Sequence, residues 1–161
     1  MIALGSDHVG LQLKLEIIKL LEERGLEYID FGTHTTDRTD YPIYGRQVAE
    51  AVAEGRCERG LLFCGTGVGI SLAANKVPGI RCVVCSDCYT AALSRSHNDS
   101  NILSLGARVV GVDLAKMIVS LWLDTAFEGG RHAERVKMLS QIEQDYQNKE
   151  GNTDHEYTAC E

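Results

Sequence analysis

Features that mark several large classes of protein are scarce in this chain of 161 residues. It holds only 2 prolines and no long run of like charge, which argues against a disordered or fibrous protein. No segment reaches the ~18 apolar residues that would span a bilayer. Met1 leads straight into Ile2 without the basic segment that opens a signal peptide. We therefore expect a cytoplasmic globular protein without a membrane attachment.

Positive charge is also in short supply. Lysine and arginine number 16 against 23 acidic residues, which gives a formal net charge of -7. A nucleic-acid binder needs a basic surface to neutralise phosphates, so this class is disfavoured. Attachment to anionic membranes is disfavoured for the same reason. Small anions remain candidate ligands because a local cluster of arginines is enough to bind them.

The chain has cysteines but lacks the spacings that would give them a metal. In the absence of a secretory signal, we expect reduced thiols at positions 57, 64, 82, 85, 88 and 160. A ferredoxin-type run built on Cys82, Cys85 and Cys88 would need a further cysteine and a proline where Ala92 and Leu93 stand. No paired Cys/His spacing suits zinc. We therefore expect no metal and no cofactor. Side-chain alternation along a strand should place Cys82 and Cys85 on opposite faces.

Short apolar runs alternate with segments of helical periodicity along the chain. They predict strands at 2–5, 27–31, 60–64, 81–85 and 102–105. Helices are predicted at 11–24, 42–55, 70–76, 87–96, 113–125 and 132–146. Such alternation favours right-handed crossovers and a parallel sheet. We predict one α/β domain over residues 1–146, a three-layer Rossmann-like fold with a five-stranded parallel sheet covered by helices on both faces. Residues 147–161 are polar and aperiodic and should form a flexible C-terminal tail; the strand order stays open.

A glycine-rich turn follows the third predicted strand. Gly65, Gly67 and Gly69 fall within five residues, where backbone N–H groups can converge on an anion. Ile70 stands where a dinucleotide-binding fingerprint needs its third glycine, and the Gly-Lys-Ser/Thr ending of a P-loop is missing. In open α/β sheets ligands bind at this carboxyl edge of the strands. By itself, however, the turn fits a tight strand–helix connection equally well.

Cys64 ends the strand that leads into this turn. A thiol pKa, ordinarily ~8.5, falls beside a helix N-terminus or cations, so Cys64 could act as a base or nucleophile. A buried, inert cysteine is the equal alternative. Arg131 and Arg135 are four residues apart at the start of the last predicted helix, so both lie on one face, where they could bind phosphate. Pairing with Glu128 and Glu134 explains these arginines equally well.

The chain resembles the type B ribose-5-phosphate isomerase family, which includes the allose-6-phosphate and galactose-6-phosphate isomerases. The resemblance covers roughly residues 1–146, and the tail departs from it. It is carried by seven segments in the family's order, Gly5–Gly10, Asp40–Pro42, Cys64–Ser71, Ala73–Lys76, Ser94–Asp99, Gly106–Gly111 and Gly129–Arg135. Some members use a glutamate a few residues after the cysteine position. Here Ser71 lies in that region, so Cys64 keeps the role.

The resemblance implies a role for each matching residue. Cys64 would move a proton between C1 and C2 with help from Thr66, and His97 would open the sugar ring with Asp7 beside it. The sugar would be lined by Asp7, His8, Tyr41 and Asn98. The enediolate would be held by the turn residues Gly65, Thr66, Gly67, Val68 and Gly69. The phosphate would be bound by His8, Arg108, Arg131 and Arg135.

Cys64 and His97 fall at opposite ends of the predicted sheet. Cys64 closes a strand, whereas His97 ends a helix and precedes the next strand, which places it near the amino edge. One subunit would not bring them together, so we predict a homodimer with shared active sites; whether dimers pair into tetramers stays open.

The resemblance thus implies an enzyme, an aldose–ketose isomerase interconverting D-ribose 5-phosphate and D-ribulose 5-phosphate in carbohydrate metabolism, the pentose phosphate pathway. A six-carbon sugar phosphate isomerase is the alternative within the class. A non-catalytic phosphosugar-binding module is the alternative outside it, although it would leave Cys64 and His97 without a purpose.

Overall fold

A computed structural model describes residues 1–150, with side chains through residue 148. Its strands are β1 (Ile2–Ser6), β2 (Tyr28–Asp30), β3 (Arg59–Cys64), β4 (Cys82–Val84) and β5 (Ile102–Gly106). Its helices are α1 (Leu11–Glu23), α2 (Tyr41–Ala53), α3 (Val68–Ala74), α4 (Cys88–Ser96), α5 (Val112–Asp124) and α6 (Arg131–Glu150).

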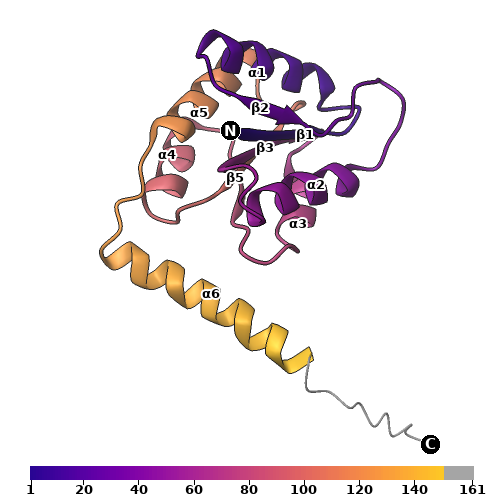
Figure 1. The fold of residues 1–161 in the computed structure, drawn as a ribbon. Coiled ribbons are helices and arrows are strands. Elements are labelled where there is room, and N and C mark those ends of the chain that lie inside the picture. The colour runs from indigo at the N-terminus through magenta and orange to yellow at the C-terminus, as the bar shows by residue number, and fades with distance from the viewer. Residues whose placement is uncertain (151–161) are drawn as a thin grey trace, which may run out of the picture.

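The five strands form one parallel sheet in the order β2-β1-β3-β5-β4 (Figure 1). Within it, Gly60 at the start of β3 pairs with Ile102, and Cys64 at its end pairs with Gly106. The loops after β1, β3 and β5 therefore leave the sheet at the same edge. The loops that lead into β3 and β5 lie at the other edge.

Two apolar layers sandwich the sheet. Buried side chains of α1, α4 and α5, such as Ile17 and Trp122, pack on one face. Those of α2 and α3, such as Val48 and Ile70, pack on the other face. The predicted three-layer α/β fold is confirmed.

Cysteines 82 and 85 lie in different layers of this sandwich. Cys82 packs with α2 and α3, whereas Cys85 packs with α4 and α5. This confirms the side-chain alternation expected over residues 81–85, although β4 itself ends at Val84.

Helix α6 continues to Glu150, four residues beyond the predicted helix end. The rest of the predicted tail, residues 151–161, lies outside the described residues. Helix α6 runs below the sheet and the helices that cover it (Figure 1), and Glu143 Oε2 accepts a hydrogen bond from the Gly79 N–H over 2.9 Å. The exposed face of α6 carries Met138, Leu139, Ile142 and Tyr146. No helix in the described part of the chain has the length and apolar character needed to cross a bilayer.

Candidate active site

Cys64 and the glycine-rich turn form the centre of the carboxyl edge. The backbone N–H of Gly67 donates to Cys64 Sγ over 3.1 Å. Gly67 has a φ of 81°, a left-handed conformation that favours glycine, and a Cβ there would lie 3.0 Å from the Leu105 carbonyl carbon. The turn therefore bends tightly against β5 and directs an N–H at the sulfur. Cys64 itself is only 4% exposed, whereas Thr66 and Val68 beside it are exposed.

Asp7 braces the neighbouring loop. Its Oδ1 accepts hydrogen bonds from the backbone N–H groups of Val9 and Gly10, each over 2.9 Å. Its own N–H donates to the Phe63 carbonyl over 3.2 Å, which ties the loop after β1 to the end of β3. The buried Asp7 carboxylate thus lies one strand away from Cys64.

Other predicted site residues surround this pair. His8 Nδ1 accepts a hydrogen bond from the Thr39 N–H over 3.3 Å, which leaves Nε2 as its other polar atom. Tyr41 packs so closely on Gly69 that a Cβ there would lie 2.8 Å from the tyrosine ring. Arg108 is exposed, and its backbone N–H donates to the Gly65 carbonyl over 3.0 Å. Its side chain lies beside the glycine-rich turn, where a Cβ on Gly65 would be 3.9 Å from Arg108 Cδ.

A second group of predicted residues lies at the amino edge. His97, Asn98 and Arg135 line a cavity of about 310 Å³ together with His132, Val136 and Leu139. Arg131 is exposed at the first position of α6. The segment before β5 is held by Arg81, which donates to the carbonyls of Asn98 and Asp99. This amino-edge group thus joins the end of α4 to the start of α6.

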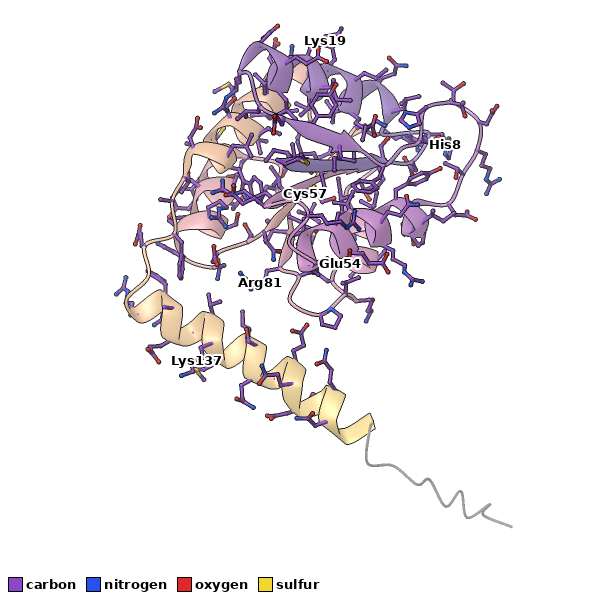
Figure 2. The ribbon with its side chains drawn as sticks, in the orientation of Figure 1. His8, Lys19, Glu54, Cys57, Arg81 and Lys137 are labelled. Atoms are coloured by element: carbon purple, nitrogen blue, oxygen red, sulfur yellow. The ribbon has the colours of Figure 1, made fainter. Side chains whose placement is uncertain are left out.

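The two groups are separated by the length of the sheet. Four residue steps lead from Gly60 to Cys64 along β3, about 13 Å at the usual rise. In Figure 2, His8 lies by the carboxyl-edge loops, and Arg81 lies toward the opposite side, above α6. The structure therefore brings Cys64, Asp7, His8, Tyr41 and Arg108 together, but not with His97 of the same chain.

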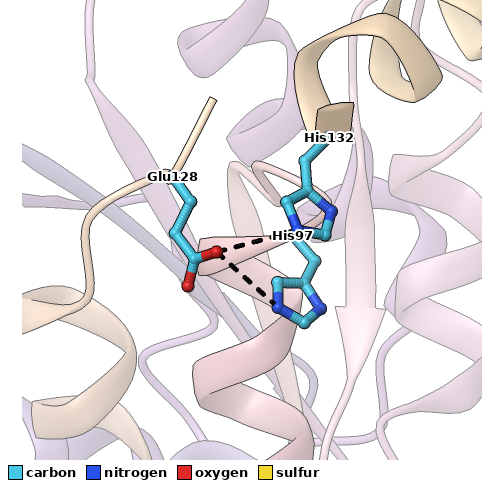
Figure 3. A group of neighbouring side chains, drawn as sticks. All are labelled: His97, Glu128 and His132. Carbon is cyan, nitrogen blue, oxygen red and sulfur yellow. Dashed lines mark ion pairs between the residues drawn. The ribbon is translucent and has the colours of Figure 1, made fainter. Parts of the chain in front are cut away.

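Two residues without an assigned role lie against His97. The imidazole rings of His97 and His132 stack with centroids 4.1 Å apart and planes 6° apart. Glu128 Oε2 lies 4.0 Å from His97 Nε2 and 3.7 Å from His132 Nε2 (Figure 3). His132 belongs to the recognised Gly129–Arg135 segment, but nothing in its spacing indicates this stack.

These three side chains are of the types that bind metal ions, and their ligand atoms lie within 4.8 Å of one another. The two rings are nearly parallel, however, so the lone pairs of their nitrogens run side by side and do not converge. The arrangement fits a stacked histidine pair that shares a carboxylate.

Burial shifts several pKa values in the described chain. It lowers the pKa of His132, and the nearby His97 and Arg131 act in the same direction. It raises the pKa of Cys57, Cys82 and Cys85 above the usual thiol range. His132 is therefore neutral at neutral pH, and these three thiols stay protonated.

Comparisons with known proteins identify the family of this chain. The Ribose/Galactose Isomerase family profile matches residues 2–139. The chain is 61% identical to ribose-5-phosphate isomerase B of Escherichia coli over 143 residues, 89% of this chain and 96% of that protein. The structure of Clostridium thermocellum ribose-5-phosphate isomerase B is 59% identical and superposes with a TM-score of 0.89, over 90% of this chain and 98% of the other.

A further solved structure contains a sugar phosphate. Ribose-5-phosphate isomerase B of Mycoplasma genitalium, with bound ribulose-5-phosphate, is 38% identical and has a TM-score of 0.86. The match covers 89% of this chain and 96% of the other. Together these matches confirm the resemblance that the sequence motifs indicated. The chain belongs to the Ribose/Galactose Isomerase family, within its type B ribose-5-phosphate isomerases, and is an isomerase.

Proposed function

We propose that this isomerase interconverts D-ribose 5-phosphate and D-ribulose 5-phosphate through an enediolate, with Cys64 as the base. The observation that carries the proposal is the hydrogen bond from the Gly67 N–H to Cys64 Sγ at the carboxyl edge of the sheet. The thiolate is the form of a cysteine that can remove a proton, and the Gly67 N–H is directed at this sulfur. Relatives named for this activity support the substrate.

The chemistry requires one proton to move between adjacent carbons. The Cys64 thiolate takes the proton from C2 of the open-chain aldose, and the electrons of that bond form the enediolate. Backbone N–H groups of the turn stabilise the negative charge that develops on oxygen. The thiol then returns the proton to C1, which yields the ketose. The hydroxyl of Thr66, beside Cys64, assists proton movement between the two oxygens.

A complete site needs a second copy of the chain. Cys64 and His97 lie at opposite edges of the sheet, so His97 of one copy would serve Cys64 of the other in a homodimer. Arg131 and Arg135 accompany His97 and would hold the phosphate of the same sugar with Arg108. Bidentate guanidinium contacts orient the substrate against the base without taking part in the chemistry.

A substrate panel tests the reaction and its base. Wild type and Cys64→Ala are assayed with ribose 5-phosphate, allose 6-phosphate and galactose 6-phosphate. We expect wild type to prefer ribose 5-phosphate and the variant to lose about 10²–10⁴-fold in kcat, the usual contribution of a positioned base. A wild-type preference for a six-carbon sugar would replace the substrate, and equal rates for both proteins would remove Cys64 from the mechanism.

Hybrid dimers test whether the sites are shared. Cys64→Ala and His97→Ala proteins are each inactive in the proposed scheme, but a mixed dimer contains one site with both residues intact. Random exchange at equal amounts should recover about a quarter of wild-type activity, since half of the dimers are hybrids with one intact site. If tagged subunits exchange and activity stays absent, the sites are not shared.

A further inference from the structure

We infer that Glu128 and His132 are positioning residues that hold the His97 ring for sugar-ring opening. This inference rests on the proposed function and adds two groups to it. Both residues lie outside the carboxyl-edge group, and each contacts His97 rather than the reacting carbons.

Glu128 is held against the end of α4 by its backbone. Its N–H donates to the carbonyl of Ser96, the last residue of α4, over 3.0 Å. His97 follows Ser96 directly, so this bond brings the Glu128 carboxylate beside the histidine. The carboxylate oxygen then faces Nε2 of His97 at 4.0 Å. Glu128 therefore lies on the Nε2 side of the ring, and Nδ1 is the ring nitrogen left to face a substrate.

His132 supplies a flat surface for the ring. It lies in the first turn of α6, where its N–H donates to the Gly129 carbonyl over 3.0 Å. Gly129 and Gly130 have φ values of 66° and 54°, a left-handed conformation through which the chain turns into the helix. His132 is only 6% exposed, so its ring is fixed by its surroundings.

Several charged groups surround the His132 ring of the stack. Glu128, Arg131 and Arg135 all act on His132, together with His97. Two stacked imidazolium ions would repel each other beside these arginines, and one carboxylate cannot balance both. Burial lowers the pKa of His132, so this ring serves as a flat, uncharged surface against which the His97 ring packs.

The step itself is balanced without any added reagent. In the furanose form of ribose 5-phosphate, the bond between C1 and the ring oxygen O4 breaks. O4 gains a proton while O1 loses one and becomes the aldehyde oxygen. His97 transfers this proton, and its ring must face O4 and O1 to do so. Glu128 and His132 fix that orientation.

The direction of the reaction separates ring opening from isomerisation. Ribulose 5-phosphate cannot form a furanose because its O5 carries the phosphate, so the reverse reaction starts from an open chain. We expect Glu128→Gln to lower kcat from ribose 5-phosphate about tenfold, a part of the ~10²–10⁴-fold that an acid–base group supplies. From ribulose 5-phosphate the loss should stay within about threefold. As a control, Glu134→Gln also removes one negative charge, here from α6, and should match wild type in both directions.

Two variants of His132 separate stacking from other effects. His132→Phe keeps a flat neutral ring and should retain most of the forward activity, whereas His132→Ala should show the direction-dependent loss. Thermal unfolding establishes that each variant is folded. Equal losses in both directions, or equal effects of Phe and Ala, would overturn the inference. A wild-type protein inactive on ribose 5-phosphate would instead overturn the proposed function.

Discussion

At the scale of single residues, the cysteines differ in their surroundings more than in their sequence context. Cys57, Cys82 and Cys85 are buried in the apolar layers, and burial raises their pKa values. Cys64 is also buried but accepts an N–H from the turn. Its place at the end of β3, beside a polar loop, separates it from the structural thiols.

This difference predicts selective alkylation. Iodoacetamide should inactivate the enzyme in step with modification of Cys64, and ribose 5-phosphate should slow both. Cys57, Cys82 and Cys85 should react far more slowly because only the thiolate attacks and their pKa values are raised. Peptide mass spectrometry measures each site. Cys88→Ser is the control, and loss of activity that follows Cys88 instead would contradict the assignment.

His132 predicts a pH dependence of stability. Folding lowers its pKa below the usual value of 6.5, so the unfolded chain binds the proton first as the pH falls. This contribution is therefore complete above about pH 6.5 and is lost as the pH falls toward the lowered folded value. The Tm of His132→Phe should decline less than that of wild type between pH 7 and 5.5. A parallel decline in the two proteins would show that His132 titrates normally.

At the scale of elements, hydrophobic periodicity predicted every strand and all six helices of residues 1–150. The strand order could not be predicted because it depends on which faces pack after each crossover. The end of α6 was predicted too early, since its last residues are polar and show no apolar period. Hydrophobic periodicity reflects burial, so the signal is weakest in a helix that contributes no side chain to the two apolar layers.

One buried ion pair joins two of these elements. Lys14 of α1 is fully buried and donates to Asp30 Oδ1 at the end of β2 and to the Thr33 carbonyl, each over 2.7 Å. Lys14→Met leaves the Asp30 carboxylate without its cation and should lower the free energy of unfolding by about 3 kcal/mol. Urea denaturation measures this change. Adding Asp30→Asn should recover part of it, and an additive loss would exclude coupling between the two side chains.

At the scale of the whole molecule, motifs predicted the two groups of site residues, and the order of strands and helices predicted their separation. Glu128 was considered only as a partner of Arg131 and Arg135, and His132 received no role. Their contact with His97 joins residues 97, 128 and 132, which come together only because α5 returns the chain to the end of α4. Because these contacts depend on how distant parts of the chain pack, no local spacing in the sequence indicates them.

The exposed apolar face of α6 leads to a prediction about formation of the proposed homodimer. Ile142 is 56% exposed on this face. In the proposed homodimer such apolar area is covered by the second copy, because burying it is favourable. Ile142→Asp should shift the protein toward monomers and reduce activity at low concentration. Gln144→Asp on the same helix is the control. Sedimentation velocity measures the assembly, and an unchanged dimer would exclude this face from the interface.

The separation of Cys64 from His97 has a consequence for how activity is governed in solution. A single chain would contribute one group of residues to each of two active sites and would complete neither site. At protein concentrations near the dissociation constant of the homodimer, turnover per chain would then rise with concentration. Dilution alone would inactivate the enzyme without unfolding it. Association between chains would serve as the on-switch, and any molecule that weakened the contact would act as an inhibitor without approaching the sugar.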